Sequence, residues 1–281
     1  MLSLAQKRSR LLLALGALLL ALLLVKLLMP GAEPTPRLST LQSSEVSRLT
    51  FSVRGGQTVS MAKTDGDWHI TQPWNRRADA SRVQILLSLL TLPASTIYSP
   101  DDLSLSEAGL AEPAATLTID DTTFLLGNAD TTQRRRYVQS GEQIALLSDL
   151  AYPVMQQQPE YFANMRVFAP GLTAISTPDW QVAKPDQLWQ SPELSQTQAE
   201  ALVRRWLDIR AARILPWPLP ARQLPDAVEA VPVSVKTPGQ TLGYVFYQLE
   251  DVTLIHADSA DHVMAVEPAA ADALLRVPDD A

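Results

Sequence analysis

One short stretch near the C-terminus has the residue types of a metal site. Residues 256–262 read HADSADH and offer two imidazoles and two carboxylates, from His256, Asp258, Asp261 and His262. Such groups can bind zinc or another divalent ion. The flanking runs VTLIHA and HVMAV resemble strands, and DSAD is typical of a turn. We favour the turn, because no third distant ligand motif accompanies the histidines, and we predict no metal and no other cofactor.

A run of three arginines, residues 134–136, could bind an anionic group. A strand would place Arg134 and Arg136 on one face and Arg135 on the other. We favour the simpler interpretation of a solvated strand start, since charge runs are usually hydrated. Arg134, Arg136, His256 and His262 are therefore the candidate binding residues, and the small-molecule ligand is unknown.

The chain offers little for enzymatic catalysis. It has no cysteine, which excludes disulfides, thiolate nucleophiles and cysteine-ligated zinc. Its three histidines supply few general bases, and the sequence has neither a G-x-S-x-G elbow nor a Gly-rich phosphate-binding motif. We predict that the protein is not an enzyme and has no catalytic residues. Metal-assisted chemistry through His256 and His262 is the alternative.

The N-terminus has the pattern of a membrane anchor. Residues 1–10 form a basic segment, and the 19 residues 11–29 are apolar apart from Lys26. About 20 apolar residues span a bilayer core, and a positive flank before them predicts a cytoplasmic N-terminus and an exported body. We predict a single transmembrane helix over residues 11–29, with a cytoplasmic N-terminus and an exported body.

A cleaved signal peptide is the alternative for the same segment. Cleavage after Ala32 would place Pro30 at a position that needs a small residue, which favours the uncleaved anchor. Residues 30–44 are rich in proline, serine and threonine, so we predict a tether between membrane and body.

The body is acidic. Beyond residue 30 the chain carries 19 basic and 30 acidic residues, a net charge of −11. Nucleic acid and anionic membrane surfaces attract positive fields. The charge therefore argues against nucleic acid as a partner, and we predict contact with the bilayer only through residues 11–29.

Two heptapeptides indicate an internal duplication. Residues 67–73 read DWHITQP and residues 179–185 read DWQVAKP, and apolar segments follow each copy in the same order at a near-constant offset. The motif positions are Asp67, Trp68, Pro73, Asp179, Trp180 and Pro185. We expect each tryptophan to anchor a core, because buried aromatic rings dominate core energetics. A role as ligand-stacking platforms is the alternative.

Each motif precedes an amphipathic helix pattern. Apolar residues at the spacing i, i+3, i+4 and i+7 define one helical face in each copy. These faces are Val83, Leu86, Leu87 and Leu90 after Asp79, and Ala199, Leu202, Val203 and Trp206 after Ser195. Asp79 and Ser195 are the predicted N-caps.

Short strand patterns surround each helix, and turn signals separate them, which implies antiparallel pairing. We predict an α+β protein in which an N-terminal transmembrane helix precedes two tandem related units. Unit 1 covers residues 45–156 and unit 2 covers residues 157–281, each a mostly antiparallel sheet packed by one amphipathic helix.

The order of short motifs in unit 1 resembles a known family. The motifs are at residues 66–73, 77–90, 109–113, 125–127 and 136–138. They resemble a bacterial family of envelope proteins defined only as a domain of unknown function, and they cover residues 45–150 best. The resemblance implies one N-terminal membrane helix, which would place the anchor in a bacterial inner membrane and the body in the periplasm. It also implies a gene often encoded beside gliding-type ABC transporter auxiliary subunits. It implies no catalytic residue.

These features lead to two expectations about function. The first is a non-enzymatic accessory or scaffold subunit of a membrane assembly, such as an ABC-type transporter, with a membrane protein as its partner. The second is a periplasmic ligand-binding module with its site between the two units, a common place for pockets. Candidates near that crevice are Trp189, Trp206, Trp217 and the arginines at 134–136.

Overall fold

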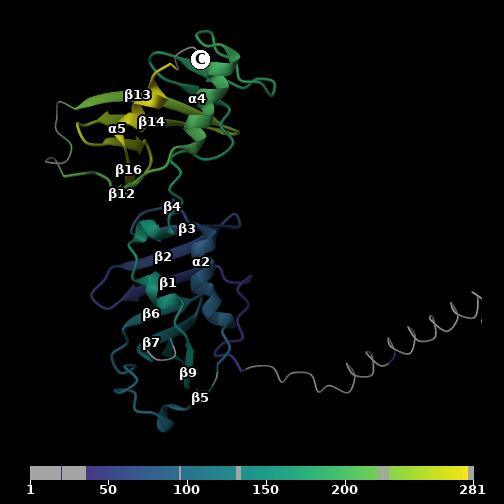
Figure 1. The fold of residues 1–281 in the computed structure, drawn as a ribbon, viewed down its shortest axis with the longest axis vertical. Helices are drawn as coiled ribbons and strands as arrows, with labels where there is room; N and C mark the ends of the chain where they lie inside the picture. Colours follow the sequence, from purple (N-terminus) through teal and green to yellow (C-terminus); the bar gives the residue numbers. More distant parts are fainter. Residues whose placement is uncertain are drawn as a thin grey trace, which may run out of the picture.

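The computed structural model describes residues 36–94, 96–130, 134–220 and 228–277, together with the single residues 20 and 224. These residues form two antiparallel sheets that follow one another along the chain (Figure 1). Few helices accompany the sheets, so the predicted α+β class is confirmed for the described part. The two units are separate sheets rather than one continuous sheet.

The predicted transmembrane helix at residues 11–29 lies outside the described residues, apart from position 20. Among the described residues, no helix has the length and apolar character needed to cross a membrane. Part of the predicted tether is described, from Pro36 onward. The Pro36 carbonyl accepts a hydrogen bond from the Ala94 N–H at 2.8 Å, and Leu38 is buried. This part of the segment therefore packs on unit 1 instead of forming a free linker.

Unit 1 contains a nine-stranded sheet in the order β4-β3-β2-β1-β6-β7-β8-β9-β5. The strands are β1 (Arg48–Val53), β2 (Thr58–Thr64), β3 (Asp67–Gln72), β4 (Arg76–Arg77), β5 (Ile97–Tyr98), β6 (Ala115–Ile119), β7 (Thr122–Asp130), β8 (Arg135–Ser140) and β9 (Gln143–Ser148). The helices are α2 (Ala80–Leu87), α3 (Ala151–Met155) and the short 3-10 turns η1 (Ser88–Thr91), η2 (Pro100–Asp102) and η3 (Pro159–Phe162).

Helix α2 forms where the sequence predicted it. The Asp79 side chain accepts a hydrogen bond from the Ser81 N–H at 3.0 Å, which satisfies one of the free donors at the helix start. The apolar stripe of α2 and η1 is almost completely buried, at Val83, Leu86, Leu87 and Leu90. The predicted N-cap and helical face of unit 1 are thus confirmed.

Unit 2 contains a seven-stranded sheet in the order β11-β10-β13-β14-β15-β16-β12. The strands are β10 (Ala174–Ser176), β11 (Gln181–Ala183), β12 (Arg213–Pro216), β13 (Glu229–Thr237), β14 (Gln240–Gln248), β15 (Thr253–Ala257) and β16 (His262–Val266). The helices are α4 (Gln196–Asp208) and α5 (Pro268–Leu275). Ser195 caps α4 in a capping box with Gln198, and the predicted face of α4 is buried.

The two sheets share one topology. Without β3 and β4, unit 1 has the order β2-β1-β6-β7-β8-β9-β5, which corresponds strand by strand to the order in unit 2. Three pairs of similar segments lie 116 positions apart in the sequence: residues 116–119 and 232–235, 125–127 and 241–243, and 137–138 and 253–254. They fall on β6 and β13, β7 and β14, and β8 and β15, which occupy equivalent places in the two sheets. The shared strand order supports the predicted duplication, and β3 and β4 are an addition to unit 1.

The two motif tryptophans anchor the cores but do not occupy equivalent strands. Trp68 lies on β3, the added strand, whereas Trp180 immediately precedes β11, which takes the place of β2. Both rings are buried, and the Trp180 Nε1–H donates to the Leu275 carbonyl at 2.7 Å. The prediction of core anchoring is confirmed, whereas the heptapeptides are related in sequence without matching in topology. Asp67 pairs with Arg77, while Asp179, Pro73 and Pro185 are exposed.

One apolar core runs through both units. The largest cluster of buried side chains extends from the β1–β3 region of unit 1 to α4 and the sheet of unit 2. Phe162, Val167 and Phe168, on the chain that connects the units, belong to this cluster. The buried apolar cluster is thus continuous from unit 1 through the connecting chain to unit 2.

Candidate functional site

The HADSADH stretch forms a hairpin turn between β15 and β16. His256 lies opposite Val263, so the two histidines are not directly paired. The His256 ring is stacked on Trp217 with centroids 4.2 Å apart, and its Nε2 lies 3.1 Å from the Ala260 carbonyl. No group of three or more potential metal ligands occurs within the described ranges. Both histidines are buried, and their contacts are with aromatic, carbonyl, arginine and carboxylate groups of the protein.

The arginine run does not form a binding face. Arg134 lies before β8 with a positive φ of 52° and is exposed, whereas Arg136 is buried. The Arg136 guanidinium holds Asp149 in a two-point ion pair at 2.9 and 3.0 Å and also donates to the Gly127 carbonyl. It lies 3.8 Å from the centre of the Tyr152 ring. Our interpretation of Arg136 as a solvated strand residue was wrong: it stabilises the fold of unit 1.

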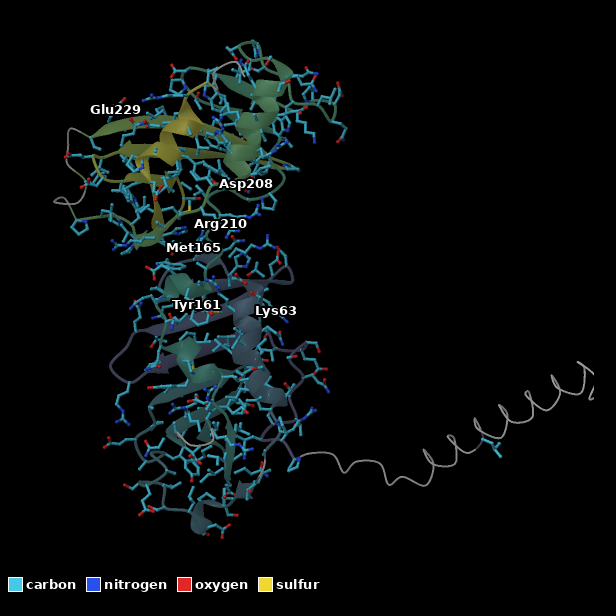
Figure 2. The ribbon with its side chains drawn as sticks, viewed as in Figure 1. Lys63, Tyr161, Met165, Asp208, Arg210 and Glu229 are labelled. Atoms are coloured by element: carbon cyan, nitrogen blue, oxygen red, sulfur yellow. The ribbon has the colours of Figure 1, made fainter. Side chains whose placement is uncertain are left out.

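A set of contacts that the sequence did not predict lies where the two units meet, around Arg76 and Asp261. This region is here called the joint. Residues 163–168, here called the connecting segment, form backbone hydrogen bonds with both units. The Asn164 N–H donates to the Arg77 carbonyl at 2.9 Å, and the Ala211 N–H donates to the Met165 carbonyl at 2.8 Å. Met165 and Arg210 lie where the two units meet (Figure 2). The chain between the units is thus tied to each of them.

Arg76 is the central side chain of this joint. Its Nε donates to the Asn164 carbonyl at 3.0 Å, and its Nη2 donates to the Arg166 carbonyl. Its Nη1 lies 3.4 Å from the Nε2 of His262 in unit 2. A single guanidinium therefore connects β4, the connecting segment and β16.

Asp261 forms the second connection. Its carboxylate accepts the backbone N–H of Asn75, 186 positions away in the chain, at 2.9 and 3.1 Å. The same carboxylate lies 2.9 Å from the His262 Nδ1. Since Arg76 can only donate, His262 accepts at Nε2 and carries its hydrogen on Nδ1, which donates to Asp261. This arrangement requires the neutral imidazole.

The surroundings of His262 favour its neutral form. Burial lowers the pKa of His262, and the electrostatic interactions with Arg76 and His256 lower it further, while the hydrogen bond and charge of Asp261 oppose these effects. A proton on Nε2 would face the N–H groups of Arg76. The joint is thus held best when His262 is not protonated.

We expect the stability of the protein to fall as the pH drops below about 6.5, the usual pKa of an unfolded histidine. Below that pH the unfolded chain takes up a proton at His262 more readily than the folded chain, so the free energy of unfolding decreases. Urea unfolding at a series of pH values between 5 and 8 measures the effect. His262→Gln should reduce the pH dependence, whereas His69→Gln, at a half-buried histidine on β3, should retain it. Equal pH dependence in the wild type and in His262→Gln would contradict this account.

A cavity of about 680 Å³ lies beside the joint, between the two units. This volume is within the range of roughly 300–1,000 Å³ typical of small-molecule sites. Unit 1, the connecting segment and unit 2 all contribute to its walls, through His69, Arg76, Arg77, Arg166, Tyr244 and Asp261. Three of these side chains are guanidinium groups, and one is a carboxylate.

The tryptophans and arginines predicted for the crevice are elsewhere. Trp206 is fully buried in the core of unit 2, and Trp217 packs with Tyr247 and His256 on the other side of that sheet. Arg134 and Arg136 are not among the residues that line the cavity, and neither is Trp189. The crevice itself exists as expected, but different side chains line it.

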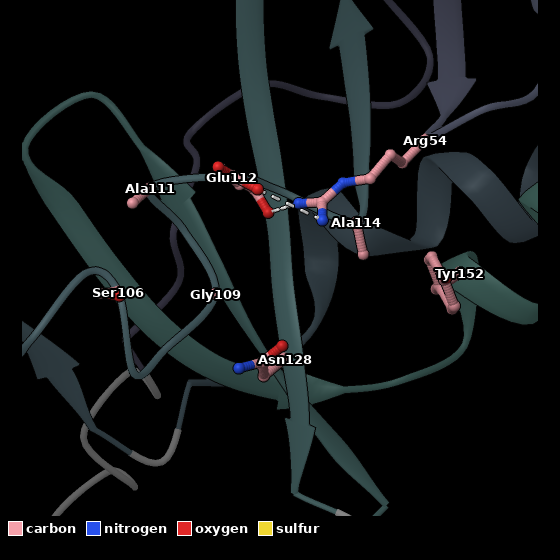
Figure 3. A pocket seen from close by; sticks show the side chains of 8 residues that line it. All are labelled: Arg54, Ser106, Gly109, Ala111, Glu112, Ala114, Asn128 and Tyr152. Atoms are coloured by element: carbon pink, nitrogen blue, oxygen red, sulfur yellow. Dashed lines mark hydrogen bonds and ion pairs between the residues drawn. The ribbon is translucent and has the colours of Figure 1, made fainter.

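A second cavity, of about 660 Å³, lies within unit 1 (Figure 3). Its most prominent charges neutralise each other: Arg54 points toward Glu112, with 3.6 Å between guanidinium and carboxylate, and also donates to the Glu112 carbonyl. The Asn128 amide donates to the Glu107 carbonyl at 2.9 Å. Because these polar groups already have partners, the cavity at the joint is the better candidate for binding a ligand.

The fold and the joint define an α+β protein of two topologically related units that share a core and enclose a cationic cavity. The chain matches the family described as "Domain of unknown function (DUF4340)" over residues 68–227, more than half of its length. It belongs to this family. The match confirms that the chain belongs to a family defined as a domain of unknown function, and it continues beyond residue 150 into unit 2. No curated protein and no solved structure matches the chain.

Proposed function

We propose that the protein is a single-pass inner-membrane protein with a cytoplasmic N-terminus and a periplasmic body. Its role would be that of a non-enzymatic accessory or scaffold subunit in a membrane assembly such as an ABC-type transporter. The apolar residues 11–29 and their basic flank support the topology. The family resemblance supports the setting.

The observation that carries the scaffold role is the joint. Arg76 and Asp261 tie unit 1 to unit 2, and the connecting segment bonds to both. A body with a continuous core and a bonded joint can hold a partner at a fixed position, whereas domains on a flexible tether cannot. Rigid coupling is what a scaffold needs.

In-cell photo-crosslinking tests this proposal. A crosslinking amino acid is placed at Leu150 in unit 1 or at Leu188 in unit 2, which are 50% and 53% exposed. We expect a membrane protein to be captured reproducibly from at least one position, and to co-purify with the unlabelled chain in mild detergent. A variant with residues 11–29 replaced by an unrelated transmembrane helix shows whether the periplasmic body alone is sufficient to bind the partner. A chain that purifies alone and captures nothing from either position would contradict the scaffold role.

A second candidate function is a ligand-binding module, and the cavity at the joint favours it specifically. Ligands that bind only the folded protein raise its unfolding temperature. A thermal-shift screen of metabolites, glycans and lipids with the full-length chain should therefore yield stabilising compounds. If no compound in the screen stabilises the protein, this second candidate is wrong.

A further inference from the structure

We propose that the cavity between the units binds a small organic anion, a carboxylate or a phosphate on a short carbon skeleton, held by the guanidinium groups of Arg76 and Arg166. This inference rests on the second candidate function above and names the chemical class of its ligand.

The first step in the argument is the charge of the two arginines. Both are half-buried and line the cavity, yet within the described part of the chain neither lies within ion-pair distance of a carboxylate. Buried charges are usually paired, because removing an ion from water is costly. A bound anion would supply the missing ion-pair partner and stabilise these two half-buried cations.

The second step is the number of free donors. Arg76 uses three of its five N–H groups, at Asn164, Arg166 and His262. The Arg166 guanidinium makes one hydrogen bond to the described residues, from Nη1 to the Leu207 carbonyl at 3.2 Å. The remaining N–H groups have no acceptor among the described residues. Guanidinium groups with free donors bind carboxylate and phosphate oxygens with two parallel hydrogen bonds.

The one acid of the cavity wall, Asp261, forms no ion pair with either arginine in the described part of the chain, and its oxygens are used elsewhere. Both Asp261 oxygens accept the Asn75 N–H, and one of them also accepts from His262. Arg77 does have a counter-ion, Asp67 at 2.9 Å, so it adds little to the binding field. Arg76 and Arg166 are therefore the guanidinium groups of the cavity wall that have no ion-pair partner among the described residues.

The remaining walls suit a short carbon skeleton. Val167, Phe168 and Leu242 provide apolar surface. Tyr244 also lines the cavity, so its hydroxyl can donate a hydrogen bond to the same anion. A ligand with an anionic group would bind the arginines through that group. Its short carbon skeleton would pack against the apolar side chains.

Isothermal titration of the full-length chain in mild detergent tests the proposal. The probes are monobutyl phosphate, butanoate and butan-1-ol, an uncharged molecule with the same carbon chain. We expect saturable binding of at least one anion at one site per chain and none of the alcohol. Arg166→Gln should weaken the binding of the anion roughly tenfold or more, because the variant loses a charged hydrogen-bonding group. Arg204→Gln is the matched control: it removes the same charge from an exposed arginine of α4 outside the cavity wall, and the variant should bind like the wild type.

Different failures have different meanings. If neither anion saturates, or if Arg166→Gln binds them as tightly as the wild type, the proposal is wrong. If butan-1-ol binds as well as the anions, the charge preference is wrong but the cavity is still a ligand site. The broader thermal-shift screen tests that second candidate function independently. Tyr244→Phe provides a second variant that keeps the ring, and it should weaken binding less than Arg166→Gln.

Discussion

Replacing Arg76 by alanine is expected to destabilise the protein by about 3 kcal/mol, because hydrogen bonds from a charged donor contribute roughly 1.5–3 kcal/mol each and rehydration offsets part of the loss. The substitution removes the bonds to the Asn164 and Arg166 carbonyls and the contact with His262. Chemical unfolding of the wild type and Arg76→Ala measures the difference. We also expect faster hydrogen exchange in the connecting segment, since that segment loses its side-chain support.

The neighbouring arginine is the control for this prediction. Arg77 forms an exposed ion pair with Asp67, and pairs of this kind contribute about 0–1 kcal/mol. Arg77→Ala should therefore change the free energy of unfolding by less than about 1 kcal/mol. If Arg76→Ala and Arg77→Ala lower the free energy of unfolding equally, the contacts of Arg76 between the units do not stabilise the protein as proposed.

Asp149→Ala is expected to have an effect of similar size, confined to unit 1. The substitution leaves the Arg136 guanidinium buried without its counter-ion, and breaking a buried pair in this way costs about 3–5 kcal/mol. The side chains of Arg136 and Asp149 are only 8% and 16% exposed, so water replaces the lost partner poorly. Unfolding in urea, followed by tryptophan fluorescence, measures the loss of stability.

Asp121 is the matched control for Asp149. Its carboxylate is 98% exposed and lies 3.9 Å from Arg48, so Asp121→Ala should leave stability unchanged. A double variant, Arg136→Met with Asp149→Ala, separates the buried charge from the lost contacts. If the double variant is no more stable than Asp149→Ala, the uncompensated charge is not the cause.

Much of the fold could be predicted from local patterns. The helical faces of α2 and α4 have the 3.6-residue period, and Asp79 and Ser195 have the side chains that cap helices. The equivalence of β6–β8 with β13–β15 followed from a constant sequence offset. The added strand β3 could not be distinguished from β11, because the shared heptapeptide gives the local conformation and not the neighbouring strand.

The joint could not be predicted, because its contacts join distant parts of the sequence. Asn75 and Asp261 are 186 positions apart, and nothing in either segment indicates the other. Charged residues after a strand are usually hydrated, so Arg76 gave no signal of burial. The ion pair of Arg136 could have been inferred from the sequence. Asp149 directly follows β9, and β9 pairs with β8 in antiparallel register within one hairpin.

The central claim is that Arg76 and Asp261 hold the two units as one body around a cationic cavity. The chain has no cysteine, so two spin labels can be attached at Glu142→Cys in unit 1 and Glu250→Cys in unit 2 without removing any native thiol. Both positions are exposed turns between strands. Pulsed electron resonance should give one narrow distance distribution in the otherwise wild-type chain and a broad one after Arg76→Ala. A wild-type distribution as broad as that of the variant would contradict the claim.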